Sequence, residues 1–135
     1  MGSAAGTVLL LGARSDIGGE IAQRVCAGRN VVLAARGRGG LEDVEKQLLD
    51  AGATAVRMVD FDAAELDSHR RVVREAGQVT TAIVAFGILG DQELAERDEG
   101  EAARIATVDY LAQVNMLTVL ADEMVAGEIY AFSSI

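Results

Sequence analysis

A chain of 135 residues, half of them hydrophobic, is long enough for one domain with a buried core. Its net charge of −9 argues against nucleic acid and anionic membrane surfaces as partners, because both attract basic proteins. A single cysteine excludes an intramolecular disulfide, and no apolar run reaches the roughly 20 residues of a membrane span. With no signal-peptide pattern at its start, the chain is expected to be cytoplasmic.

Short apolar runs alternate with longer helical patterns along the chain. The short runs predict buried strands, and runs whose apolar residues recur every three or four positions predict helices. Glycines follow these helical patterns, as they commonly do where a helix ends. The predicted strands are 8–11, 30–35, 55–59, 81–86 and 128–132, and the predicted helices are 16–27, 41–51, 66–76 and 101–125.

Repeated strand–helix–strand units predict a parallel sheet with helices on both faces. Because a glycine turn follows the first strand, we expect a Rossmann-like doubly wound α/β fold with strand order 3-2-1-4-5. Its ligand crevice should lie beyond the carboxyl ends of strands 1 and 4. No linker or repeat divides the chain, so residues 1–135 are expected to form a single dinucleotide-binding domain.

The turn after the first strand predicts a cradle for the phosphates of a dinucleotide. Gly12 allows a tight turn, Gly18 allows the helix to approach both the strand and a pyrophosphate, and the free N–H groups face the anion. An acid within this turn should repel a pyrophosphate, so Asp16 or Ser15 is expected to cap the helix instead. The alternative is a strand-to-helix turn with a structural role only. The predicted cradle comprises Gly12, Arg14, Ser15, Asp16, Ile17 and Gly18.

Basic residues follow the second predicted strand, where an acid would bind ribose hydroxyls and favour NAD. Arg36 stands directly after that strand, with Arg38 close by and Arg14 in the glycine turn. Guanidinium groups suit a 2′-phosphate, which favours NADP over NAD as the cofactor. The alternative is that these arginines are solvated loop residues.

Five stretches of the chain resemble the short-chain dehydrogenase/reductase family. The similarity extends over residues 7–134, although Asp16 replaces the middle glycine of the family's Gly-x-x-x-Gly-x-Gly turn. Within the family the chain is most similar to the reductases of decaprenylphosphoryl keto-pentoses, the reducing partners in the decaprenylphosphoryl-β-D-ribose 2′-epimerase system. The stretches are 7–12, 15–18, 59–63, 83–91 and 127–134.

The resemblance implies further contacts with a dinucleotide. Asp62, which Ala63 follows, matches an acid that contacts the adenine amino group; Asp60 is the second choice, and a helix cap is the alternative role. The backbone of Ala85, Phe86 and Gly87 should pass beside the cofactor, although most of the family carries Asn-Asn-Ala-Gly there.

The resemblance also implies catalytic roles. Ser134 matches a serine that hydrogen-bonds the substrate carbonyl, and Asp109 stands where an asparagine holds a water in the proton relay. The family's Tyr-x-x-x-Lys pair is absent, since neither Tyr110 nor Tyr130 is followed by lysine at the fourth position. General acid catalysis is worth roughly 10²–10⁴-fold. We therefore expect the chain to be truncated after the fifth strand and inactive as given.

The sequence thus favours an NAD(P)-dependent oxidoreductase that reduces a keto sugar or related ketone, for which the subgroup's polyprenylphosphoryl 2-keto-pentose is the specific candidate. The alternative is a non-catalytic dinucleotide-binding or interaction module. The lone His69 cannot build a metal site and is expected on a helix surface. The segment 101–125 is more apolar than one sheet face requires, which predicts a homo-oligomer.

Overall fold

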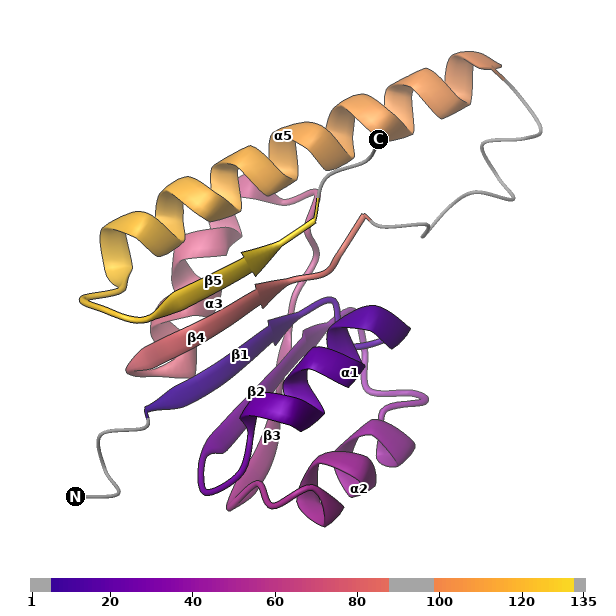
Figure 1. Ribbon diagram of the computed structural model, residues 1–135. Coiled ribbons are helices and arrows are strands. Elements are labelled where there is room, and N and C mark those ends of the chain that lie inside the picture. The colour runs from indigo at the N-terminus through magenta and orange to yellow at the C-terminus, as the bar shows by residue number, and fades with distance from the viewer. Residues whose placement is uncertain (1–5, 88–98, 133–135) are drawn as a thin grey trace.

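The computed structural model describes residues 6–87 and 99–132, with side chains from residue 107 onward in the second range. Five parallel strands form one sheet in the order β3-β2-β1-β4-β5, and helices cover both of its faces (Figure 1). This confirms the predicted doubly wound α/β fold and its strand order.

The elements follow the predicted boundaries closely. The strands are β1 Thr7–Leu11, β2 Asn30–Ala35, β3 Ala55–Asp60, β4 Val79–Val84 and β5 Glu128–Ala131. The helices are α1 Asp16–Val25, α2 Glu42–Asp50, the 3-10 helix η2 Leu66–Ser68, α3 His69–Ala76 and α5 Glu99–Glu123. No helix in the described ranges combines the length and apolarity that crossing a membrane requires.

Two predicted elements differ from the structure. The predicted helix 66–76 divides into η2 and α3, and the predicted strand 81–86 lies two residues earlier as Val79–Val84. After β4, the Ala85 N–H still donates to the Leu11 carbonyl at 2.8 Å before the chain turns at Phe86 and Gly87. Ala85 and Phe86, the apolar residues at the end of this run, therefore follow the strand instead of belonging to it.

Each face of the sheet has its own apolar core. Leu9 and Leu11 of β1 pack into the core on the α3 and α5 side, which includes Val72 and Met116. The alternate residues of the strands pack into the core on the other side, together with Ala22 of α1 and Leu48 of α2. Because β1 is buried on both faces, it is an uninterrupted apolar run in the sequence.

His69 is completely buried, so the prediction that it lies on the surface is wrong. Its Nε2 lies 2.8 Å from the carbonyl oxygen of Ala63, and its Nδ1 lies 2.9 Å from Nδ2 of Asn115. A polar side chain can be buried when each of its polar atoms has a partner. Both partners of His69 lie outside α3, so the local sequence pattern gave no sign of them.

Ion pairs join the C-terminal end of α5 to α3. The Glu123 carboxylate accepts from Arg70 at 2.6 Å and from Arg74 at 3.0 Å, and Asp122 also accepts from Arg70 at 3.0 Å. Hydrogen bonds from Arg74 and Arg70 lower the pKa of Glu123. The same bonds raise the pKa values of the two guanidinium groups.

Candidate functional site

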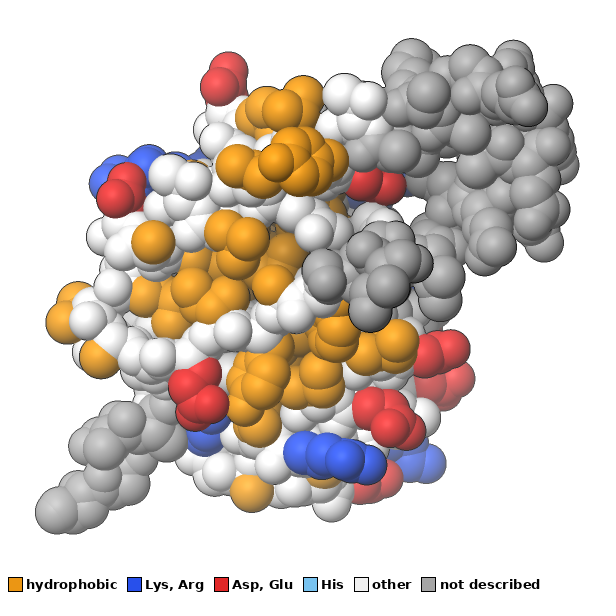
Figure 2. Space-filling model, turned by 45° about the horizontal axis from the view of Figure 1, so that its top comes forward, with side chains coloured by type: hydrophobic (Ala, Val, Ile, Leu, Met, Phe, Trp, Pro, Cys, Tyr) orange, Lys and Arg blue, Asp and Glu red, His pale blue; other side chains and the backbone are white. Residues whose placement is uncertain are grey.

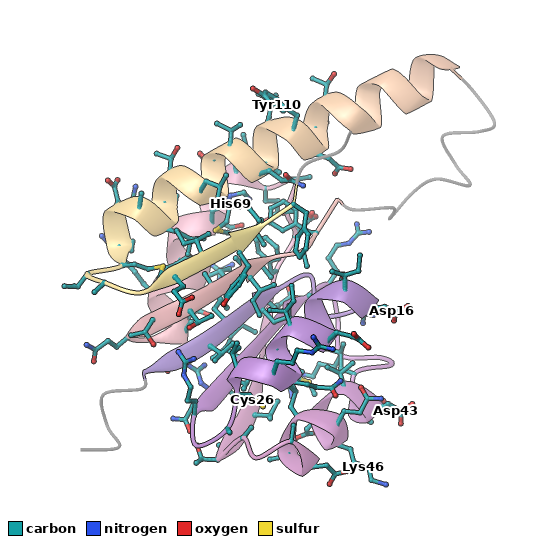
Figure 3. All side chains as sticks on the ribbon, viewed as in Figure 1. Asp16, Cys26, Asp43, Lys46, His69 and Tyr110 are labelled. Carbon is teal, nitrogen blue, oxygen red and sulfur yellow. The ribbon has the colours of Figure 1, made fainter. Side chains whose placement is uncertain are left out.

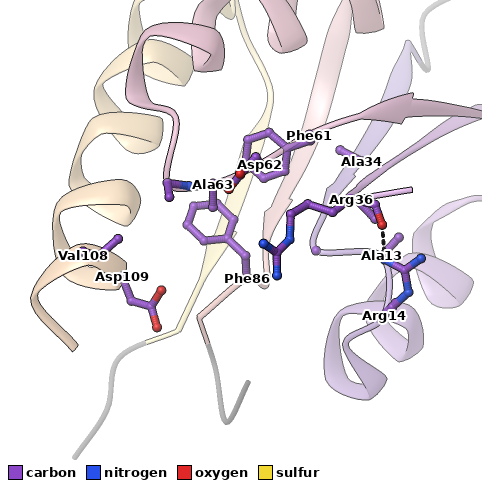
Figure 4. A pocket seen from close by; sticks show the side chains of 13 residues that line it. Ala13, Arg14, Ala34, Arg36, Phe61, Asp62, Ala63, Phe86, Val108 and Asp109 are labelled. Atoms are coloured by element: carbon purple, nitrogen blue, oxygen red, sulfur yellow. Dashed lines mark hydrogen bonds between the residues drawn. The ribbon is translucent and has the colours of Figure 1, made fainter. Parts of the chain in front are cut away.

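A cleft of about 430 Å³ opens at the carboxyl ends of β1, β2, β3 and β4, with α5 as its far wall (Figure 4). Seven of the predicted site residues line it: Gly12, Arg14, Arg36, Asp62, Ala63, Phe86 and Asp109. Its other lining residues are Ala13, Ala34, Ala35, Phe61, Ala64 and Val108. The described residues at the carboxyl edge of the sheet thus surround one opening.

The glycine turn packs tightly against the chain that follows β4. Gly12 has a φ of +98°, and a Cβ there would lie 2.7 Å from the backbone nitrogen of Phe86. A Cβ at Gly18 would lie 2.7 Å from Cβ of Ala85 and 2.9 Å from Cδ1 of Leu10. Only glycine fits at these two positions without movement of their neighbours, so the start of α1 lies directly on the strand ends.

The start of α1 is capped by Ser15, one of the two predicted caps. Its Oγ accepts from the Gly18 N–H at 3.1 Å. Asp16 is exposed and lines a separate shallow groove on the outer side of α1 with Ile17 and Glu20 (Figure 3). The carboxylate of Asp16 thus does not line the cleft, which reduces the repulsion that an acid in the glycine motif would exert on an anion there.

Arg14 and Arg36 have different surroundings, although both line the cleft. The Arg14 guanidinium donates to backbone carbonyls of the loop after β2, at 2.9 Å to Arg36 and 2.6 Å to Gly39. On the other side of this loop, Oδ1 of Asp60 accepts from the Gly37 N–H at 3.1 Å. Figure 4 shows the Arg36 side chain extending into the cleft. Arg14 and Asp60 therefore hold the loop that carries Arg36.

The turn after β3 forms a second wall of the cleft. Oδ1 of Asp62 accepts from the Ala64 N–H at 3.0 Å, and the Asp62 carbonyl accepts from the Glu65 N–H at 3.0 Å. Asp62 thus caps its own turn while it lines the cleft. The rings of Phe61 and Phe86 lie beside each other in this wall, with centroids 5.5 Å apart.

Helix α5 closes the cleft opposite the glycine turn. Asp109 faces Gly87, where an added Cβ would lie 3.1 Å from the Asp109 Cγ, and Gly87 has a φ of +78°. One turn further along α5, Nε2 of Gln113 donates to the Phe86 carbonyl at 3.1 Å. Helix α5 therefore supports the chain after β4 at two points. Ser134, the other predicted catalytic residue, lies outside the described residues.

Several residues of the site were missed by the sequence analysis. Ala34 and Ala35 end a predicted strand, and their small size, which leaves room for a ligand, was the available signal. Gln113 and His69 lie within hydrogen-bond distance of the backbone carbonyls of Phe86 and Ala63, and no sequence motif marks these contacts. Among the described residues no group of acidic, histidine or cysteine side chains is arranged to hold a metal ion.

The geometry can hold an elongated ligand that carries both an anionic and a ring-shaped part. Backbone N–H groups at the start of a helix attract anions, and the Arg36 guanidinium adds a positive charge on the same side. Aromatic and alanine side chains also line the cleft, and the Asp62 and Asp109 carboxylates offer acceptors.

Comparison of the sequence with known proteins assigns the chain to a protein family. Residues 6–135 match the short chain dehydrogenase family. An uncharacterized oxidoreductase of Mycobacterium tuberculosis (strain H37Rv) is 46% identical over 138 residues, which cover 97% of this chain and 55% of that relative. The chain thus spans about half the length of this relative.

Two solved structures share the fold. NAD⁺-bound xylitol dehydrogenase matches with a TM-score of 0.73 and 21% identity, over 93% of this chain and 51% of that chain. A 3-oxoacyl-(acyl-carrier-protein) reductase from Agrobacterium tumefaciens C58, with NADP bound, matches with a TM-score of 0.70 and 21% identity, over 96% of this chain and 54% of that chain.

Proposed function

The chain belongs to the short-chain dehydrogenase family, and on that premise we propose that residues 1–135 are a single dinucleotide-binding domain of an NAD(P)-dependent oxidoreductase. The observation that carries this proposal is the cleft at the carboxyl ends of four parallel strands. Gly12 and Gly18 stand beside it at positions where a Cβ would clash. This combination suits the close approach of a pyrophosphate to the start of α1.

The cleft and the turns beside it have proposed roles toward the cofactor. The backbone at Ser15–Gly18 binds the pyrophosphate, Asp62 and Ala63 contact the adenine, and Ala85–Gly87 lie along the remainder of the cofactor. The nicotinamide, when bound, supplies the hydride. The protein excludes water from this surface with Phe86 and orients the cofactor between the glycine turn and α5.

NADP is the proposed cofactor, rather than NAD. Arg36 extends into the cleft from the end of β2, and the loop that carries it is held by Arg14 and Asp60. A guanidinium held there suits the 2′-phosphate that distinguishes NADP from NAD. Arg14 contributes by positioning this loop, because three of its nitrogens already donate to backbone carbonyls.

Fluorescence titration with NADPH and NADH tests both proposals. We expect NADPH to bind more tightly, and Arg36→Ala to weaken NADPH binding by roughly tenfold or more while changing NADH binding by less than about threefold. Arg71→Ala is the matched control, because Arg71 pairs with Glu75 on α3 and does not line the cleft. Absence of binding of either dinucleotide at millimolar concentration would refute the dinucleotide site. Tighter binding of NADH would refute only the preference for NADP.

A keto sugar or related ketone is the proposed substrate class, and a polyprenylphosphoryl 2-keto-pentose is the specific candidate. Support comes from the similarity of residues 83–91 and 127–134 to the reductases of such sugars. In this proposal Ser134 hydrogen-bonds the substrate carbonyl. Asp109 takes the place of the family's relay asparagine. Its carboxylate can accept a hydrogen bond, but it lacks the N–H donor of an amide. The proposed activity belongs to a protein that also carries a Tyr-x-x-x-Lys pair, and a keto-sugar reductase assay with NADPH on such a protein tests it.

One observation favours a second candidate, a dinucleotide-binding module without catalysis. Asp109 lines the cleft with a carboxylate where the family's proton relay uses an amide. The gene sequence beyond the codon for Ile135 distinguishes the two candidates. An in-frame continuation into Tyr-x-x-x-Lys supports the reductase, and a natural stop codon supports the module.

A second copy of this chain is the proposed partner, and α5 is the proposed contact. Apolar side chains stand exposed along α5: Tyr110 is 69% exposed, Leu111 49% and Val114 44% (Figure 2). Leu111, Val114, Thr118 and Ala121 follow one another at intervals of three and four residues, which aligns them on one face. An apolar helix face of this kind suits pairing with the same face of another copy.

A further inference from the structure

We infer that His69 is a positioning residue for the dinucleotide cleft: it fixes the turn after β3 and the aromatic wall, and it ties both to α5 through Asn115. This inference rests on the proposed function, because it assigns His69 a role at that same cleft. His69 does not line the cleft itself. It acts through the residues that do.

The hydrogen bonds of His69 select one form of its ring. The Ala63 carbonyl, 2.8 Å from Nε2, can only accept, so Nε2 carries a hydrogen. Nδ2 of Asn115 lies 2.9 Å from Nδ1 and also 3.1 Å from the Leu66 carbonyl. Because a carbonyl requires a donor, the NH₂ group of Asn115 points toward both acceptors. Nδ1 of His69 therefore accepts, and the ring is neutral with its hydrogen on Nε2.

The first partner of His69 belongs to the cleft wall. Ala63 lines the cleft between Asp62 and Ala64, whose backbone forms the turn after β3. The bond from Nε2 to the Ala63 carbonyl holds this turn from behind. His69 is completely buried, so a lost bond would leave its own Nε2 without water to replace the carbonyl.

The His69 ring also supports the two aromatic residues of the cleft. Its centroid lies 5.5 Å from that of Phe61 and 6.3 Å from that of Phe86, and both phenylalanines line the cleft. The three rings form one tilted cluster, so the position of His69 limits where the two phenylalanine rings can lie. Moving the imidazole would therefore shift both phenylalanine rings of this wall together.

The second partner of His69 connects this cluster to the wall of the cleft that α5 forms. Asn115 lies on α5, less than two turns after Val108 and Asp109, which line the cleft. Its amide bonds both His69 and the Leu66 carbonyl at the start of η2. His69 thus joins the turn after β3 to α5, and this link holds these two walls of the cleft in place relative to each other.

Three variants of the 135-residue chain test the inference by NADPH titration, with circular dichroism to establish folding. His69→Phe keeps a ring but removes both hydrogen bonds, and we expect NADPH binding to weaken by about tenfold or more. His69→Gln provides an amide donor for the Ala63 carbonyl, and we expect it to recover most of that loss.

Asn115→Ala removes the link to α5 without altering a lining residue, and we expect a smaller loss in the same direction. Arg71→Ala is the control, because Arg71 is exposed on α3, pairs with Glu75 and does not line the cleft.

The result that overturns the inference is a folded His69→Phe variant that binds NADPH as tightly as the unaltered chain. A second measurement remains available if that variant does not fold. His69 is the only histidine of the chain, so ¹⁵N NMR of the imidazole reports on it alone. We expect a fixed neutral ring with hydrogen on Nε2 and ring resonances that shift when NADPH saturates the chain. A ring that exchanges between tautomers, or resonances that NADPH leaves unchanged, would also overturn the inference. If the unaltered chain binds no dinucleotide, the proposed function fails, while the tautomer still tests the hydrogen bonds of His69.

Discussion

Two adjacent glycines in α1 have opposite surroundings. Gly18 faces the strand ends, where a Cβ would lie 2.7 Å from Cβ of Ala85 and 2.9 Å from Cδ1 of Leu10. Gly19 has nothing within 4 Å of the same added atom. Both belong to the first turns of one helix. They therefore form a matched pair for asking whether close packing at the glycine turn matters.

The first prediction compares Gly18→Ala with Gly19→Ala. Overpacking at Gly18 should lower the free energy of unfolding by about 1–3 kcal/mol, because Ala85 and Leu10 must move. It should also weaken NADPH binding, since Ala85 precedes the chain that lines the cleft. At Gly19, alanine should raise stability by roughly 0.5–1 kcal/mol through its better helix propensity. Urea unfolding of both variants checks this, and equal effects at the two positions would contradict the packing argument.

For single residues, the sequence indicated those whose place in the site follows from the neighbouring strand or helix. Gly12 and Gly18 stand between a strand and a helix, and that context is visible in the chain. Arg36 was predicted as a lining residue from its place after a strand. The role of His69 was not predictable, because its partners Ala63 and Asn115 come from other elements. A buried polar side chain is determined by tertiary partners rather than by local pattern.

Among the helices, α3 and α5 are joined through the Glu123 carboxylate by two arginines. Glu123 is 20% exposed and accepts from both Arg70 and Arg74, whereas Glu75 is 46% exposed and pairs with Arg71 within α3. The Glu123 carboxylate thus connects two helices, whereas the Glu75 carboxylate forms a pair within one helix. Because α5 forms a wall of the cleft, the connection at Glu123 also helps to fix that wall.

The second prediction concerns pH. The arginines lower the pKa of Glu123 below its ordinary value of 4.5, so its ionised form stabilises the folded chain. That contribution is complete above pH 4.5 and disappears as the pH falls through the lower value of the folded state. Glu123→Gln should therefore lower the melting temperature at pH 7, and the difference from the unaltered chain should vanish in acid. Glu75→Gln is the control and should have a smaller effect. A difference that persists unchanged in acid would refute the linkage.

The elements themselves were largely predictable. Strand β2 and the start of α1 have their predicted limits because turn residues and glycines flank clear apolar patterns. The break between η2 and α3 was missed because no glycine or proline marks it in the sequence. The true end of β4 was missed because Ala85 and Phe86 are as apolar as the strand, although they follow it and Phe86 lines the cleft. Apolar character alone does not separate a strand from a ligand-facing segment.

For the whole molecule, the parallel sheet determines where a site can form. All strands end at the same edge, so residues from β1, β2, β3, β4 and α5 meet there although they are far apart in sequence. The prediction of this edge required only the strand order, which follows from the repeated strand–helix units. The width of the cleft depends on side-chain contacts between α3 and α5. These contacts cannot be predicted from the strand order.

The apolar face of α5 leads to a prediction about the assembled state. A chain with net charge −9 repels its copies at long range, so association requires a specific apolar contact. We expect light scattering at micromolar concentration to show a dimer or larger assembly. Leu111→Glu should shift it to a monomer, because a carboxylate within the contact would lose its hydration.

The control for this experiment lies on the other side of the sheet. Leu49 on α2 is 45% exposed, close to the 49% of Leu111, and Leu49→Glu introduces the same charge away from α5. We expect the Leu49 variant to remain assembled, since only α5 carries the proposed contact. A monomeric unaltered chain would refute the contact, and dissociation by both variants would show that added charge, rather than the α5 face, controls assembly. Retained NADPH binding in the monomeric Leu111 variant would show that binding does not require assembly.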